Sequence, residues 1–328
     1  MIASAFSAHA LDPADWMREL LPYIIDKNLN DIAWPGSHDS ATHKIDKSSN
    51  IAKGQDIPTC LDHIKFITGD IIANWSKAQK FSIYSQLMMG VRFLDLRITH
   101  NDSEKTHYSV HGVFGQKVDE IIEEIWQFMD EHPTEIIILS IGGLSHMIYE
   151  EKDTNEDLIQ KFYARFGDKY ISNRFSPNTP LIDILNTDGR LILIYQEDKF
   201  IEENVQNVPS DFLWSKTNIV SPWAKTDDVN ALWKFLEEES KWFHETPKNQ
   251  FYLVGATLTP NEKTIISALN PFDSKAPKNI SDMAKIVREK INFYALIDMF
   301  RTGVHSIFTM DFVNQVDVEQ IIWLNALP

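Results

Sequence analysis

The sequence contains a single cysteine, Cys60, among its 328 residues. One cysteine cannot form a disulfide within the chain, so we expect a buried, inert thiol and a fold held by an apolar core. Basic residues are in the minority, and the net charge of -16 opposes binding to nucleic acid or to an anionic membrane surface. The sequence also has no apolar run long enough to span a bilayer.

The first ten residues have neither the basic start nor the long apolar stretch of a secretory signal. These features predict a cytoplasmic or peripheral membrane protein, and they leave export by a signal-free route open. The 9 Trp and 19 Phe are expected mostly in the core, although some could supply a peripheral membrane contact that does not depend on basic charge.

Hydrophobic residues make up 43% of the chain, which is enough for a sizeable core. Eight short segments, rich in β-branched residues, read as strands. They cover residues 31–34, 92–98, 108–112, 135–141, 190–196, 218–223, 250–258 and 306–312.

Helical periodicity follows several of these strands, at residues 117–131, 228–244 and 281–301, and a short capped helix from residue 12 ends at Pro22 near the start of the chain. Continuous apolar strands that alternate with helices favour an α/β fold with a covered parallel sheet. We therefore predict a single, irregular TIM-like (β/α)8 barrel domain over residues 1–328 with a short N-terminal helix, and an open doubly wound sheet is the alternative.

Ionisable side chains lie at the ends of four predicted strands. His38 and Asp39 follow the first strand, Asp95 and Arg97 end the second, His111 ends the third and Asp311 lies in the last. Barrel enzymes place their catalytic groups at the carboxyl ends of strands, so these residues are expected to meet on one rim. A lone histidine or an Asp-x-Arg pair is often structural, but core packing rarely needs this combination of residues.

The segments that carry these residues resemble the X domain of phosphatidylinositol-specific phospholipases C. The matching stretches are residues 34–42 (WPGSHDSAT), 86–97 (QLMMGVRFLDLR), 111–112 (HG) and 128–137 (FMDEHPTEII). Their order, spacing and strand context all agree with that family. The resemblance is dense between residues 15 and 141 and sparse afterwards.

The resemblance implies a phosphoric diester hydrolase that works by general acid and base catalysis. His38 would take the proton from the hydroxyl next to the phosphate, and His111 would protonate the departing glycerol oxygen. Arg97 would hold the phosphate, with Asp95 positioning it. Asp39 would pair with His111, and Asp311 with His38. The residue types suit this chemistry, because two histidines can serve as base and acid at neutral pH if their environments separate their pKa values.

The sequence departs from the family at its metal and head-group positions. Calcium-dependent members have an acid where this chain has Arg97, so no metal and no other cofactor is expected. The bacterial, metal-independent type has cations where this chain has Gly142 and Gln196. We therefore expect a rebuilt head-group pocket around His146, Gln196 and Trp223, with a phospholipid or glycerophosphodiester as substrate.

Two other functions fit parts of the pattern. A barrel that binds lipid or phosphate without turnover would need no acid and base, yet every acid and base position is filled. A metal-dependent glycerophosphodiesterase would need clustered carboxylates, and Arg97 stands in their place. The phosphodiesterase interpretation is therefore favoured.

Overall fold

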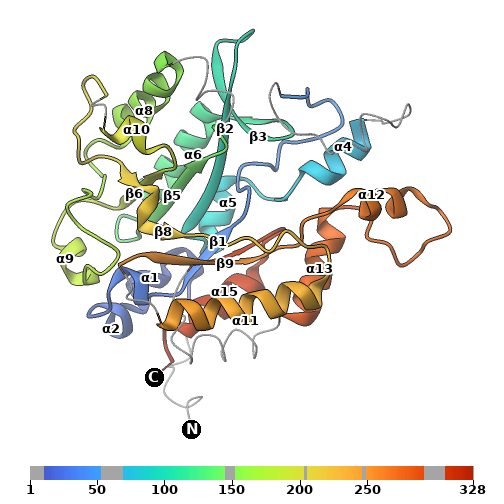
Figure 1. Ribbon diagram of the computed structural model, residues 1–328. Helices are drawn as coiled ribbons and strands as arrows, with labels where there is room; N and C mark the ends of the chain where they lie inside the picture. Colours follow the sequence, from blue (N-terminus) through green and yellow to red (C-terminus); the bar gives the residue numbers. More distant parts are fainter. Residues whose placement is uncertain are drawn as a thin grey trace.

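The computed structural model describes residues 11–52, 69–144, 152–202, 205–245, 249–291 and 307–327. Eight parallel strands form one curled sheet in the order β7-β6-β5-β2-β1-β10-β9-β8 (Figure 1). Their bounds are β1 Trp34–Ser37, β2 Phe93–Asn101, β5 Ile137–Gly142, β6 Leu191–Tyr195, β7 Trp214–Ser215, β8 Ile219–Val220, β9 Phe251–Ala256 and β10 Ile307–Met310. The predicted α/β barrel is confirmed.

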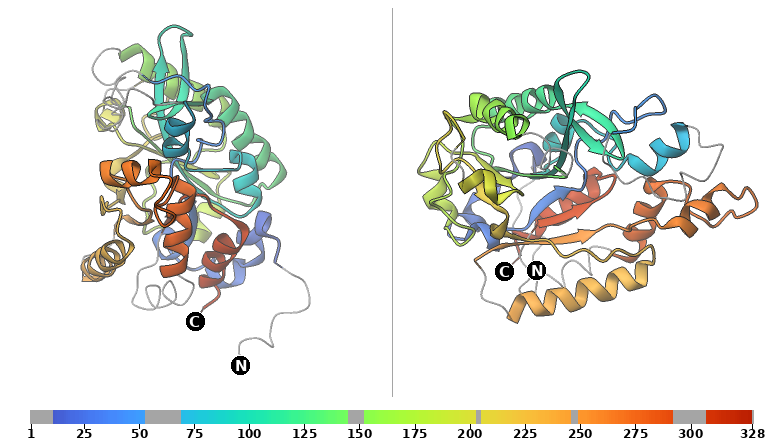
Figure 2. Two further views of the ribbon diagram at one scale, coloured as in Figure 1. Left: turned by 90° about the vertical axis from the view of Figure 1, so that its right-hand side faces the viewer. Right: turned by 45° about the horizontal axis from the view of Figure 1, so that its top comes forward.

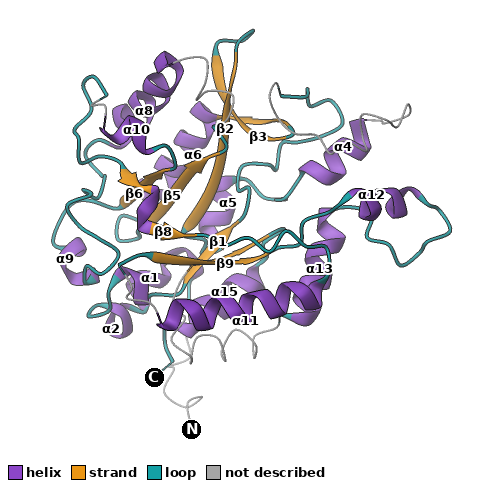
Figure 3. Ribbon diagram, in the orientation of Figure 1, coloured by secondary structure: helices purple, strands orange, loops and turns teal. Residues whose placement is uncertain are grey.

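Helices pack around the outside of this sheet (Figures 2 and 3). They are α1 Trp16–Glu19, α2 Leu21–Ile24, α4 Gly69–Ser76, α5 Ile83–Met88, α6 Val118–Glu131, α8 Lys152–Phe166, α9 Leu181–Leu185, α10 Asp198–Glu202, α11 Val229–Glu245, α12 Glu262–Leu269, α13 Ile280–Lys290 and α15 Gln315–Leu324. Helix α6 shows why they form, because its apolar residues recur every three or four positions and are buried, while two acids occupy its first turn. In the described part of the chain, no helix is both long and apolar enough to cross a membrane.

The sheet has a seam between its two edge strands. β7 pairs with β6, and β8 pairs with β9, and the three-residue 3-10 helix Lys216–Asn218 joins β7 to β8 across the seam. Each edge strand has only two residues, so little backbone is left to pair across the gap. This seam accounts for the predicted irregularity of the barrel.

A buried ion pair fastens the N-terminal helices to the bottom of the barrel. Arg92 precedes β2 and Glu135 precedes β5, and Nη2 of Arg92 lies 2.7 Å from Oε2 of Glu135. Glu135 also accepts hydrogen bonds from the backbone N–H groups of Met17 and Arg18, and Arg92 donates to the carbonyl of Ala14. The N-terminal segment therefore closes the end of the barrel opposite the carboxyl ends of the strands.

Two predicted strands differ from the structure. The segment at 108–112 belongs to β3 (Thr106–His111), which pairs antiparallel with β2 and with β4 (Val113–Lys117) and is not a barrel strand. Sequence pattern cannot separate such a hairpin strand from a barrel strand, because both are short and β-branched. The missing barrel strand is β7, whose two residues are too few to show a pattern. The first strand begins at Trp34, later than predicted, because a 3-10 helix, Leu29–Asp31, precedes it.

Two helix ends also differ. Pro22 does not end the helical segment, because it lies in the first turn of α2. The N–H groups of a first turn make no hydrogen bond within the helix, so a proline is tolerated there. The helix predicted at 281–301 begins at Ile280 and ends at Lys290, with Ile291 as its C-cap, so it is shorter than predicted. Residues 292–301 lie outside the described residues, as does Cys60.

Candidate active site

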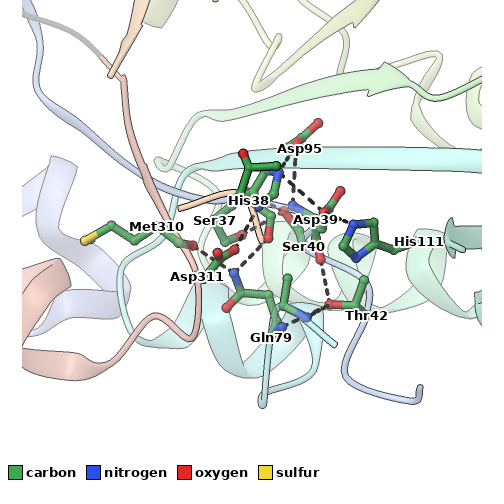
Figure 4. A network of polar contacts seen from close by, with 12 residues as sticks. Ser37, His38, Asp39, Ser40, Thr42, Gln79, Asp95, His111, Met310 and Asp311 are labelled. Atoms are coloured by element: carbon green, nitrogen blue, oxygen red, sulfur yellow. Dashed lines mark hydrogen bonds and ion pairs between the residues drawn. The ribbon is translucent and has the colours of Figure 1, made fainter. Parts of the chain in front are cut away.

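The six predicted catalytic residues come together, five of them at the carboxyl ends of neighbouring barrel strands. His38 and Asp39 follow β1, Asp311 follows β10, and Asp95 and Arg97 lie in β2. These three strands are adjacent in the order β2-β1-β10, so their ends meet on one rim. Figure 4 shows His38, Asp39, Asp95, Asp311 and His111 facing one another there.

The His38 ring is held between carboxylates. Its Nδ1 lies 2.8 Å from Oδ1 of Asp311, and its Nε2 lies 3.4 Å from Oδ2 of Asp39. Burial of the ring lowers its pKa, but the negative charges of Asp39 and Asp311 outweigh this and raise the pKa of His38 from 6.5 to about 9. Nη2 of Arg97 lies 3.1 Å from Nε2 of His38. The positive charge of Arg97 lowers the pKa of His38, because the guanidinium can donate a hydrogen bond to the neutral ring but not to the protonated one.

Asp39 lies at the centre of the cluster. Its φ of 44° puts it in the left-handed region, which Asp tolerates better than most residues, and this turns the carboxylate inward. Oδ1 lies 2.7 Å from Nε of Arg97, and Oδ2 lies 3.5 Å from Nε2 of His111. Burial raises the pKa of this carboxyl, but the Arg97 guanidinium and the two histidines outweigh it and hold the pKa well below its usual value. Asp39 is therefore the anionic partner of both histidines.

His111 reaches the cluster from β3, where the antiparallel hairpin turns into β4. Its Nδ1 lies 2.8 Å from the backbone carbonyl of Ser76, the last residue of α4, so Nδ1 carries a proton and donates it. The other nitrogen, Nε2, faces Asp39. The His111 side chain is 30% exposed.

Arg97 and Asp95 both line one cavity at this rim, as their spacing of two residues on one strand predicts. Asp39 makes the short contact with Arg97, and Oδ2 of Asp95 lies 3.9 Å from Nε of Arg97. Burial raises the pKa of Asp95. The Arg97 side chain remains 38% exposed, so part of its donor set faces the cavity.

A cavity with about 300 Å³ of free space opens beside these residues. Gln196 and Trp223, both predicted to bind substrate, line it, and the Trp223 ring lies 5.0 Å from the His38 ring. The Gln196 amide donates to Oγ of Ser140 and fills the space over Gly142, where a Cβ would collide with it. His146 lies outside the described residues. The other lining residues are Phe93, Gly143, Ile219, Ser221, Leu253 and Thr309.

Three polar residues near the site were not predicted. Gln79, Thr42 and Ser76 contact the catalytic segments through backbone atoms, and Figure 4 shows Gln79 and Thr42 beneath His38 and Asp39. Thr42 is the last residue of the 34–42 motif, but nothing in the motif indicated this contact, whereas Gln79 and Ser76 lie outside every motif and predicted strand. The contacts of Gln79 and Ser76 form only where distant segments meet, so the sequence carried no signal for them.

Among the described residues, the ligand atoms of His38, Asp39 and Asp95 lie within 4.8 Å of one another, close enough to share a metal ion. The guanidinium of Arg97 already contacts two of the three, at 2.7 Å from Asp39 and 3.1 Å from His38. A divalent ion bound there would meet this fixed positive charge at close range. The donor set therefore fits the guanidinium better than a metal ion.

Comparison with known proteins shows the family of this chain. Residues 60–197 match the model of the family described as phosphatidylinositol-specific phospholipase C, X domain. The human PI-PLC X domain-containing protein 2 is 30% identical over 260 residues, which cover 78% of this chain and 81% of the relative. The Mus musculus protein of the same name is 29% identical over 96% of this chain and 88% of its own length. The chain belongs to the PI-PLC X domain family.

Solved structures show the same fold. The phosphatidylinositol-specific phospholipase C of Listeria monocytogenes superimposes with a TM-score of 0.66 at 17% identity, covering 95% of this chain and 98% of that chain. A phosphatidylinositol-specific phospholipase C of Staphylococcus aureus gives a TM-score of 0.64 at 15% identity, with 97% and 100% covered. At these identities the likeness concerns the barrel and leaves the activity to be argued from the site.

Proposed function

We propose that this protein is a metal-independent phosphoric diester hydrolase that cleaves a glycerophospholipid-type phosphodiester by paired-histidine catalysis. One observation carries the proposal. His38 and His111 face the same carboxylate oxygen of Asp39, at 3.4 and 3.5 Å, while Arg97 binds the other oxygen at 2.7 Å. Two proton-transfer groups and a fixed cation thus meet at one carboxylate, and His38 and Arg97 also line the adjoining cavity that a phosphate would enter.

The first chemical step assigns the base to His38. Nδ1 is engaged by Asp311, so Nε2 is the atom that takes the proton from a head-group hydroxyl next to the phosphate. The hydroxyl oxygen then attacks phosphorus and forms a cyclic phosphodiester. Asp311 stabilises the imidazolium that His38 becomes, as a carboxylate on the far nitrogen does.

The same step assigns the acid to His111. Its Nδ1 donates to the Ser76 carbonyl, so the transferable proton lies on Nε2, the nitrogen that faces Asp39. As the phosphorus–oxygen bond to glycerol breaks, this proton passes to the departing oxygen. Water then opens the cyclic product with the roles reversed, His111 accepting a proton and His38 returning one.

Arg97 supplies the positive charge that a calcium ion would otherwise provide. A bound phosphate oxygen would take over the Nη2 contact that His38 now makes, which frees the lone pair of the base. The planar guanidinium can bridge two phosphate oxygens and stabilise charge that grows on them in the transition state. Nε remains on Asp39, so the group stays oriented throughout.

A panel of phospholipids and soluble glycerophosphodiesters, with product identification, tests this proposal. We expect phosphodiester cleavage in chelator, and a loss of about a hundredfold or more in His38→Ala and in His111→Ala. The matched control is His132→Ala, because His132 also binds an aspartate, Asp15, but at the opposite end of the barrel. Full activity in either folded active-site variant contradicts the assignment, and binding without turnover would indicate a lipid-binding barrel instead.

A further inference from the structure

A buried glutamine joins the two chain segments that carry His38 and Asp311. Gln79 lies between α4 and α5 and is 1% exposed. Its Nε2 donates to the carbonyl of His38 at 2.8 Å and to that of Met310 at 2.9 Å, and its Oε1 accepts from the N–H of Val313 at 3.1 Å. All three partners are backbone atoms of the β1 and β10 ends.

These hydrogen bonds hold β1 and β10 together beyond the last residue pair of their parallel ladder. The parallel ladder ends at Ser37 and Met310, after which His38 N–H still donates to the Met310 carbonyl. Phe312 then has a φ of 48°, so the second segment turns away from the first. Gln79 holds this turning segment on both sides of Asp311, through Met310 and Val313.

The residues next to Gln79 hold the rest of the acid–base cluster. The Ser76 carbonyl accepts from His111, and the N–H groups of Ala78 and Gln79 donate to Oγ1 of Thr42. Thr42 in turn donates to the carbonyl of Asp39 at 2.9 Å. The four residues from Ser76 to Gln79 thus contact His38 and His111 directly, and they contact Asp39 through Thr42.

We propose that Gln79 is a positioning residue that fixes His38 against Asp311. The inference rests on the proposed acid and base roles of the two histidines. Because the two residues are 273 positions apart in sequence, their 2.8 Å contact depends on the alignment of two separate strand ends. Proton transfer is sensitive to displacements of such groups by less than 1 Å, so a clamp at this point affects the chemistry directly.

A purely structural role for Gln79 makes a different prediction. Gln86 is equally buried, and its Nε2 also donates to two backbone carbonyls, those of Ser40 and Phe81, at 2.8 Å each. Removing either amide takes a side-chain donor away from two buried carbonyls and destabilises the fold by a comparable amount. Of these two glutamines, Gln79 alone binds the backbone on both sides of the His38–Asp311 contact, so its removal, unlike that of Gln86, is expected to change the ionisation of His38.

The test is an NMR titration of the ring of His38 in the full-length protein, which needs no substrate. The variants are Gln79→Met and the control Gln86→Met, which keep similar volume and remove the hydrogen bonds. The charged groups that face His38 are Asp39, Asp95, Arg97 and Asp311, and none of them is altered. We expect the pKa of His38 to fall by about one unit or more in Gln79→Met, a tenfold loss of proton affinity, and to stay unchanged in Gln86→Met.

An unchanged His38 titration in folded Gln79→Met would overturn the inference, and so would an equal shift in the control. If Gln79→Met does not fold, Gln79→Asn keeps a neutral amide that is one methylene too short to reach both carbonyls, and a fall in the pKa of His38 is expected there as well. An active His38→Ala protein would remove the proposed catalytic role and leave this titration result intact. The two failures are therefore distinguishable.

Discussion

The buried pair Arg92–Glu135 allows a quantitative prediction about stability that does not depend on the activity. Both side chains are fully buried, and Glu135 accepts from two backbone N–H groups of the N-terminal segment as well as from Arg92. Glu135→Gln keeps the shape and one acceptor oxygen but removes the charge that compensates the Arg92 guanidinium. A buried charge that loses its partner typically costs 3 to 5 kcal/mol, so we expect a loss of about 3 kcal/mol in the free energy of unfolding.

Urea unfolding followed by circular dichroism measures this loss, since a total stability of roughly 5 to 15 kcal/mol leaves the variant folded but clearly weakened. The matched control is Glu123→Gln, which breaks an ion pair of 2.8 Å with Arg165 on the surface. Solvent screens that pair, so its loss should cost less than about 1 kcal/mol. If Glu135→Gln destabilised the protein no more than the control, the ion pair would not be what fastens the N-terminal helices.

Further predictions concern pH, the pocket and the metal. Since His38 must be deprotonated to act as base while His111 must be protonated to act as acid, kcat/KM should fall on both the acid and the alkaline side, and a flat profile between pH 5 and pH 9 would count against the paired-histidine mechanism. The raised pKa of His38 also stabilises the fold, fully below pH 6.5 and no longer above about pH 9, so wild type should lose more stability than His38→Gln between pH 6 and pH 10 in urea unfolding. Gly142→Ala should displace the Gln196 amide and change head-group preference among lipids, while the shape of the pH profile stays the same. Arg97→Lys should lose about a hundredfold in turnover or more, and excess chelator should cost nothing; recovery of a chelated enzyme by calcium would refute metal independence.

Much of the architecture could be predicted because the central strands are continuous apolar runs. Residues 137–141 and 191–195 are buried on both faces of the sheet, so their composition alone marks them as parallel strands. The catalytic groups could be proposed for a related reason. Most of them follow such strands, inside motifs whose order resembles one family, and the structure brings all six together.

The rest depended on contacts between distant segments. His111 comes from an antiparallel hairpin, and sequence pattern cannot say that a hairpin will fold back over the rim. The central place of Asp39 follows from a left-handed turn at one residue, which no periodicity records. Gln79 acts on backbone atoms some 40 and 230 positions away, so nothing beside it in the chain marks its role.

The seam between β7 and β8 lies on the side of the barrel away from most of the acid–base residues. The acid–base residues come mainly from β2, β1 and β10, which lie in the middle of the strand order, each paired on both sides. Gln196 and Trp223 follow β6 and β8, next to the unpaired edges. We expect substitutions at Gln196 to reshape this side of the cavity without shifting the β2-β1-β10 ladder that aligns the histidines, whereas Trp223, whose ring lies 5.0 Å from that of His38, contacts both regions. A barrel built in this way can acquire new substrates while it keeps one reaction.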